Sequence, residues 1–132
     1  MSPENVQRVH EVYEAMNRKD LATLQRLADE YPEHEWRNAP DMPEAATRVG
    51  PASALGYLED LFRTFDQLHT TVREVIDLGT AGAIFVVRHR VRGAASGAEV
   101  ERDEVHLWRT VDDRVVGMEE FLTVDEARAA AV

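Results

Sequence analysis

The chain has 132 residues, of which 44% are hydrophobic, and its 25 acidic and 15 basic side chains give a formal net charge of -10. This length and apolar content predict one folded domain, residues 1–132, with its own core. The acidity argues against nucleic acid and anionic membranes as partners, because phosphate binding needs clustered Lys and Arg. The absence of cysteine excludes disulfides, thiol nucleophiles and Cys-ligated metals. With no signal-like start and no long apolar run, we expect a cytoplasmic protein without a membrane span.

Three segments carry the signals of amphipathic helices. The Ser-Pro-Glu sequence at 2–4 predicts a helix start, and apolar residues then recur every three or four positions as far as Met16. Asp20 is a good N-cap for a second helix over 21–29. A third helix is predicted over 51–66 from its apolar spacing.

Alternating and β-branched runs predict the strands, over 35–38, 72–78, 83–92, 100–110 and 115–122. At the tight turn before the last strand, we expect Asp113 to accept a positive φ. The loop 39–49 includes Met42 and Pro43, which we expect near the mouth of a cavity, and the tail 125–132 reads as frayed helix. This order predicts an α+β fold: a cone-shaped, curved, mostly antiparallel sheet with three helices packed on its concave face.

The period of two along a strand assigns side chains to the two faces of the sheet. We assign to the inner, cavity-lining face Phe85, Val87, His89, Asp103, Val105, Leu107, Met118, Glu120 and Leu122. We assign Glu104, His106 and Trp108 to the outer face. Apolar residues would then be exposed outside, namely Ile84, Val86, Trp108 and Phe121. Such a surface predicts a homodimer through the outer sheet face.

Several segments in this order resemble the SnoaL-like polyketide cyclase and ketosteroid isomerase superfamily, which shares the nuclear transport factor 2 fold. They are the helix end VYEAMNRKD at 12–20, the strand 35–40, Gly50 before the third helix, and the segments 106–108 and 112–121. The resemblance extends over nearly the whole chain and implies an interior cavity for a small molecule. Because functions in this superfamily are diverse, the fold alone does not select a reaction.

The resemblance also maps functional positions onto this chain. In steroid isomerases a proton-shuttling Asp follows the second helix; Asn38 aligns there, and an amide cannot act as a general base. The positions of the isomerase oxyanion hole fall at Val12 and Val105, so ketosteroid isomerase activity is not expected. In polyketide cyclases a carboxylate on the last strand serves as acid or base, and Glu120 matches that position.

Glu120 is therefore the first catalytic candidate, since a carboxylate in an apolar cavity can exchange protons near neutral pH. His89 and Asp103 are candidates to orient or assist it. The alternatives are an ion pair for Glu120, a hydrogen-bonded or exposed His89, and an edge carboxylate for Asp103. The expected ligand contacts are Tyr13, Met16, Trp36, Asn38, Tyr57, Leu61, Phe85, Val87, Val105, Leu107, Met118 and Leu122. We expect no cofactor and no metal site, because the spacing of the three candidates matches no metal motif.

Two classes of function follow. The first is an enzyme that performs cofactor-free acid/base chemistry, such as cyclisation, isomerisation, dehydration or hydrolysis, on a small apolar or polycyclic molecule. The second is a non-catalytic module of the same fold that binds a small ligand or another protein. The absence of the isomerase Asp favours the second class over a narrow isomerase, whereas Glu120 supports the first.

Overall fold

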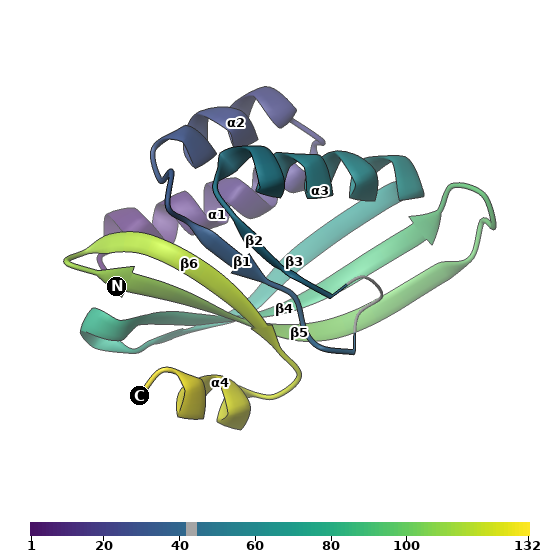
Figure 1. Cartoon of the computed structure of the whole chain (residues 1–132). Helices are drawn as coiled ribbons and strands as arrows, with labels where there is room; N and C mark the ends of the chain where they lie inside the picture. Colours follow the sequence, from purple (N-terminus) through teal and green to yellow (C-terminus); the bar gives the residue numbers. More distant parts are fainter. Residues whose placement is uncertain (42–44) are drawn as a thin grey trace.

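The computed structural model describes residues 1–41 and 45–132 and shows helices on both sides of one curved sheet (Figure 1). Met42 and Pro43, expected near a cavity mouth, lie outside the described residues. The helices are α1 (Pro3–Asn17), α2 (Leu21–Asp29), α3 (Pro51–Thr64) and α4 (Val124–Ala130), with a 3-10 turn, η1 (Gly79–Ala81). Within the described part of the chain, no helix is both long and apolar enough to cross a bilayer.

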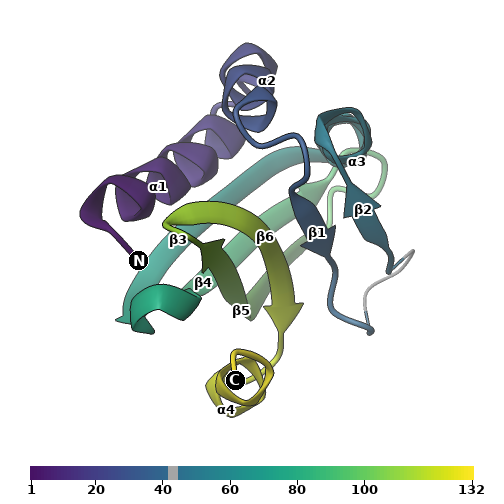
Figure 2. The same ribbon diagram turned by 60° about the vertical axis from the view of Figure 1, so that its left-hand side comes forward.

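The first two helices begin at the residues that the sequence indicates. The Ser2 side chain accepts a hydrogen bond from the backbone N–H of Asn5, and Asp20 accepts one from Thr23, so each cap satisfies a free donor of the first turn. α1 then turns Val9, Tyr13 and Met16 into the core. These contacts pack α1 against the sheet, and Figure 2 shows the helix alongside β3.

One six-stranded sheet forms the other layer of the domain. Its strands are β1 (Glu35–Arg37), β2 (Thr47–Val49), β3 (Phe65–Asp77), β4 (Gly82–Gly93), β5 (Glu99–Val111) and β6 (Arg114–Phe121). The spatial order is β2-β1-β6-β5-β4-β3, and only the β1–β6 pair is parallel. The predicted α+β class and the mostly antiparallel sheet are thus confirmed.

Two strands differ from the sequence-based expectation. β3 begins at Phe65, seven residues before the predicted start at Val72, and β2 lies within the segment expected to be a loop. Over its first half β3 buries only Leu68 and Thr70, between exposed polar residues. Because the inward-facing position at 70 is polar, the sequence there lacks the apolar alternation that marks a strand.

Two turns require unusual backbone conformations. Asp112 and Asp113 have φ values of 49° and 59°, which confirms the positive φ expected at Asp113. Gly82 has φ 130°, and a Cβ placed there would lie 1.9 Å from the carbonyl oxygen of Trp108. Only glycine lets β4 approach β5 this closely at the start of the strand.

The strand register corrects the predicted faces of β5. Phe85 lies opposite His106, and His106 lies opposite Glu120. Directly opposed residues of neighbouring strands share a face. Glu104, His106 and Trp108 therefore face inward, and Asp103, Val105 and Leu107 face outward, the reverse of the prediction.

The fourth helix explains why the prediction for β5 was wrong. α4 packs on the outer face of the sheet, opposite the other three helices (Figure 1). There it covers a second apolar cluster that includes Ile84, Val105, Leu107 and Ala127. Val105 and Leu107 therefore pack against α4 and do not line the cavity. The tail that we expected to be a frayed helix is thus a capped helix. Because α4 covers this part of the outer face, Ile84 is buried and is not part of the exposed surface on which the dimer prediction rested.

Candidate active site

A cavity of about 250 Å³ lies between the inner face of the sheet and helices α1 and α3. Its walls are largely apolar and include Met16, Leu61, Leu68, Val91 and Met118. Polar side chains from three adjacent strands gather on one side of it: His89, Glu104, His106 and Glu120. An apolar pocket with a few convergent polar groups is the usual form of a small-molecule site.

Glu120 projects into this cavity from β6 and is 6% exposed. The parallel pairing of β1 with β6 brings the donors that hold it. Trp36 Nε1 lies 3.4 Å from Oε2, while Asn38 Nδ2 and the backbone N–H of Ala39 lie 3.1 and 3.0 Å from Oε1. These three donors fix the orientation of the carboxylate relative to the cavity.

Asn38 has a supporting role in this arrangement. Its Nδ2 lies 3.1 Å from Glu120 and 3.3 Å from the Tyr57 hydroxyl, and its Oδ1 accepts a hydrogen bond from Arg48. An amide can donate to a carboxylate on one side and accept from a guanidinium on the other, which a carboxylate at this position could not do. Burial raises the pKa of Tyr57 to about 12, so its hydroxyl stays protonated.

Next to Glu120 lies a group that we call the His–Glu cluster, consisting of His89, Glu104 and His106. Glu104 Oε1 lies 3.0 Å from His89 Nε2 and 2.8 Å from His106 Nε2. Its other oxygen, Oε2, accepts a 2.7 Å hydrogen bond from Arg102 Nε. Glu104 and His106 are each only 2% exposed, so a carboxylate is held in the interior by three nitrogen groups.

The charge of Glu104 follows from these contacts. Burial alone would raise the pKa of its carboxyl, but the hydrogen bonds from His106 and His89 outweigh burial and hold that pKa below its usual range. The carboxylate is therefore ionised. Arg102 compensates its charge, and Arg102 is itself paired with Asp41 at 3.0 Å.

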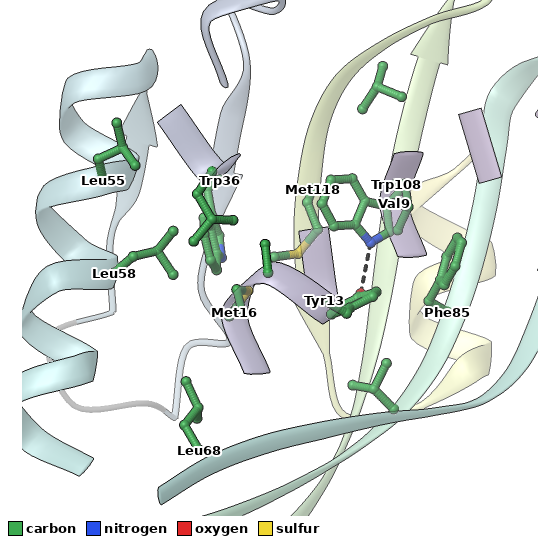
Figure 3. Packing of buried hydrophobic residues seen from close by; sticks show 14 of the residues in the cluster. Val9, Tyr13, Met16, Trp36, Leu55, Leu58, Leu68, Phe85, Trp108 and Met118 are labelled. Atoms are coloured by element: carbon green, nitrogen blue, oxygen red, sulfur yellow. Dashed lines mark hydrogen bonds between the residues drawn. The ribbon is translucent and has the colours of Figure 1, made fainter. Parts of the chain in front are cut away.

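A chain of hydrogen bonds connects Trp108, Tyr13 and His106. Trp108 Nε1, which can only donate, lies 2.9 Å from the Tyr13 hydroxyl oxygen (Figure 3). Burial raises the pKa of Tyr13 well above its ordinary value, so the hydroxyl keeps its proton and can donate it to His106 Nδ1, 2.6 Å away. In that direction of bonding, neutral His106 carries its own proton on Nε2 and donates it to Glu104.

The two acid/base groups are adjacent. His106 Nε2 lies 3.9 Å from Glu120 Oε2, and both side chains line the cavity. A ligand atom in the cavity can therefore meet a carboxylate and an imidazole at the same time. Carboxylates and imidazoles are both side chains that general acid–base catalysis commonly uses.

The structure brings together most of the residues that the sequence nominated. Lining the same cavity are Glu120, His89, Tyr13, Met16, Trp36, Tyr57, Leu61 and Met118. Asn38 contacts Glu120 from behind, and Phe85 and Val87 are fully buried beneath the same face of the sheet.

Four nominated residues lie elsewhere. Asp103 is on the outer face, where both of its oxygens bind Arg88 at 2.8 and 3.2 Å. Val105 and Leu107 are buried under α4, and Leu122 follows the end of β6 and is 51% exposed. The placement of these four in the cavity was wrong. For the three β5 residues the assignment ranked the apolar positions as inward and took no account of a helix on the outer face, whereas for Leu122 the strand ends one residue earlier.

Sequence reasoning also missed three members of the site: Glu104, His106 and Trp108. The available signal was the alternation of a carboxylate, an imidazole and an indole at positions 104, 106 and 108, two residues apart on one strand. These residues lie two strands from Trp36 and one strand from His89. Polar residues in such a pattern can line a cavity as well as face solvent.

Comparison with known proteins identifies the family of this chain. The profile of the SnoaL-like domain matches residues 9–118. A comparison with curated proteins found no significant match.

Solved structures share the fold over almost the whole chain. An NTF2-like protein of unknown function from Burkholderia pseudomallei superposes with a TM-score of 0.77 at 24% identity, over 96% of this chain and 95% of that one. TerC, co-crystallised with polyporic acid, superposes at 0.74 with 18% identity, over 96% and 97%. A protein from Catenulispora acidiphila with a ketosteroid isomerase-like fold, in complex with trimethylamine, also superposes at 0.74, with 13% identity over 99% and 94%. At these identities the comparisons establish the NTF2-like fold.

Proposed function

The chain belongs to the SnoaL-like domain family, and from this premise we propose that it is an enzyme that moves protons on a small, largely apolar molecule. The observation that carries the proposal is the 3.9 Å approach of His106 Nε2 to Glu120 Oε2 at one side of an apolar cavity. A carboxylate and an imidazole so placed can remove a proton from one ligand atom and return it to another.

In this proposal Glu120 takes a proton from one atom of the ligand and returns it to another, and His106 assists by hydrogen bonding to the ligand. Trp36, Asn38 and Ala39 keep Glu120 aimed at the ligand, and the Tyr13 hydroxyl and Glu104 keep the ring of His106 in place. The apolar walls would contact the apolar body of the ligand. Cyclisation, isomerisation, dehydration and hydrolysis all use such a pair, and the cavity volume suits a ligand of two or three fused rings.

The test compares Glu120→Gln with Glu119→Gln. Gln keeps the shape of Glu but cannot accept a proton, so turnover should fall by about 10²-fold or more in Glu120→Gln. Glu119 is the matched control, because it is the next residue, lies on the opposite face and pairs with Arg109 at 2.8 Å. Ligands are first selected from a panel of enolisable bicyclic and tricyclic ketones by the rise in melting temperature, and turnover is then followed by mass spectrometry and NMR.

The alternative is a binding module with the same cavity. A binder would gain thermal stability from a ligand without changing it, and Glu120→Gln would alter affinity alone. Retention of full turnover by Glu120→Gln, or its equal loss in Glu119→Gln, would contradict the assignment of Glu120 as the proton acceptor.

We also propose a homodimer through the outer sheet face, with a different surface from the one that the sequence suggested. Beyond the area that α4 covers, this face carries cross-strand ion pairs of Arg88 with Asp103 and of Arg90 with Glu101, at 2.8 Å each. Opposite charges in alternation can pair with a second copy related by a two-fold axis. Light scattering that gave 14.9 kDa at micromolar concentration would contradict the dimer.

A further inference from the structure

The His–Glu cluster has a second feature, besides the approach of His106 to Glu120. His89 Nε2, His106 Nε2 and Glu104 Oε1 converge, and all three atoms lie within 4.8 Å of one another. Two imidazole nitrogens and one carboxylate oxygen are a common ligand set for transition metals in catalytic sites, where further positions stay open for water or substrate.

The distances suit a single ion. Two ligand atoms that are each about 2.1 Å from an ion lie about 3 Å apart when their bonds meet at a right angle. The separations from Glu104 Oε1 to His89 Nε2 and to His106 Nε2 are 3.0 and 2.8 Å. These two separations therefore match a single ion, and the two histidine nitrogens lie within 4.8 Å of each other.

Each ligand also has a second partner that would hold it in position. His89 Nδ1 lies 2.8 Å from the Thr70 hydroxyl, and His106 Nδ1 lies 2.6 Å from the Tyr13 hydroxyl. A hydroxyl can accept as well as donate, so both contacts persist when the ring proton moves to Nδ1 and leaves Nε2 bare for a metal. Arg102 holds the other oxygen of Glu104 at 2.7 Å. Such outer contacts orient ligands at metal sites.

We propose that His89, Glu104 and His106 bind one divalent transition-metal ion, with its open positions directed into the cavity. The carboxylate of Glu120 would face the ion from β6, since its Oε2 lies 3.9 Å from His106 Nε2 and adds negative charge to the site. Two nitrogen ligands select zinc, iron, cobalt or nickel over magnesium and calcium, which prefer oxygen. An oxygen-bearing ligand in the cavity would then bind to the ion while its apolar body contacts the walls.

The test is calorimetric titration of the chelator-treated full-length chain with Zn²⁺, with Mg²⁺ as the oxygen-preferring comparison. We expect one Zn²⁺ per chain and at least 100-fold weaker binding of Mg²⁺. His89→Ala should lower Zn²⁺ affinity at least tenfold, because it removes a ligand at the edge of the cavity, where its side chain is 16% exposed. His69→Ala is the matched control, because His69 is exposed on β3, outside the cluster, and should leave binding unchanged.

A second measurement does not depend on any variant. Zn²⁺ should shift the imidazole NMR signals of His89 and His106 in the wild-type chain and leave those of His69 in place. Failure of the wild-type chain to bind Zn²⁺ at stoichiometric amounts would overturn the proposal. So would wild-type affinity in His89→Ala, or signals of the two cluster histidines that do not respond. Because no readout here is turnover, the result is separate from that of the Glu120→Gln experiment.

Discussion

The Tyr13 hydroxyl is expected to stabilise the fold through two buried partners, and Tyr13→Phe removes it alone. The ring would still pack against Phe85, whose centroid is 5.9 Å away, so the buried apolar surface stays the same. What changes is hydrogen bonding: the Trp108 N–H, 2.9 Å from the hydroxyl, and His106 Nδ1, 2.6 Å from it, lose their partner in the interior.

The expected magnitude follows from those two partners. A buried polar group left without a hydrogen bond costs about 1–3 kcal/mol, so the loss of a partner by two groups should lower the free energy of unfolding of Tyr13→Phe by about 2–6 kcal/mol. For a domain of this size that corresponds to a fall in melting temperature of roughly 8–24 °C. This is a large share of the roughly 5–15 kcal/mol that folded domains have.

Urea denaturation followed by circular dichroism measures the effect, with Tyr31→Phe as the matched control. The Tyr31 hydroxyl bonds to Arg8 near the surface, so its loss should change the free energy of unfolding by less than about 0.5 kcal/mol. A Tyr13→Phe protein within that same margin of the wild type would refute the hydrogen-bond chain through Trp108, Tyr13 and His106. Equal losses in both variants would show a general effect of removing a phenol rather than one of this site.

Three further predictions concern stability. Burial lowers the pKa of His34 to about 4, below its usual 6.5. The contribution of neutral His34 to the free energy of unfolding is therefore fully present above pH 6.5 and is lost as pH falls towards 4, and between pH 7 and pH 5 this loss should be about 2 kcal/mol. Urea midpoints at both pH values should therefore differ more in the wild type than in His34→Gln, and equal differences would contradict the assignment. Gly82→Ala should cost at least about 2 kcal/mol in chemical denaturation, because its Cβ would overlap the Trp108 carbonyl, and a neutral result would mean that the β4–β5 approach can relax. Gly56→Ala, inside α3 with nothing within 4 Å of the new methyl group, should instead stabilise by about 0.5–1 kcal/mol, and a lower melting temperature would contradict this reading of the helix.

Local signals were sufficient for the framework of the fold. The caps at Ser2 and Asp20 and the apolar stripe of α1 depend on neighbours within a few residues, and the structure confirms the helix starts that they predict. Glu120 could be nominated from the sequence because Met118, two residues away on the same strand, gave its face of β6 an apolar character. The start of β3 could not be predicted from the sequence. Thr70 faces the core as a hydrogen-bond partner of His89, so this position lacks the apolar residue that marks a strand.

The face of β5 is the clearest case of information that is not local. Both faces of β5 carry apolar side chains, and the period of two indicates only that successive side chains point to opposite faces of the sheet. The pairing of His106 with Phe85 on one side and Glu120 on the other decides which set faces the cavity, and α4, 13 residues beyond the end of the strand, gives Val105 and Leu107 a buried surface of their own.

By itself, the sequence determined the class of the fold, the order of its helices and of its strands other than β2, and the first two helix caps, because these depend on spacing within single elements. It also nominated Glu120 and His89, through their faces of the strands and, for Glu120, through the resemblance to polyketide cyclases. Only the tertiary structure decided that Asp103 leaves the site, that Glu104 and His106 enter it, and that Asn38 supports a carboxylate instead of replacing one. Those outcomes depend on strand register and on contacts between residues up to 93 positions apart, as for Tyr13 and His106. No periodicity within one segment can specify such contacts, because the partner lies on another strand or helix.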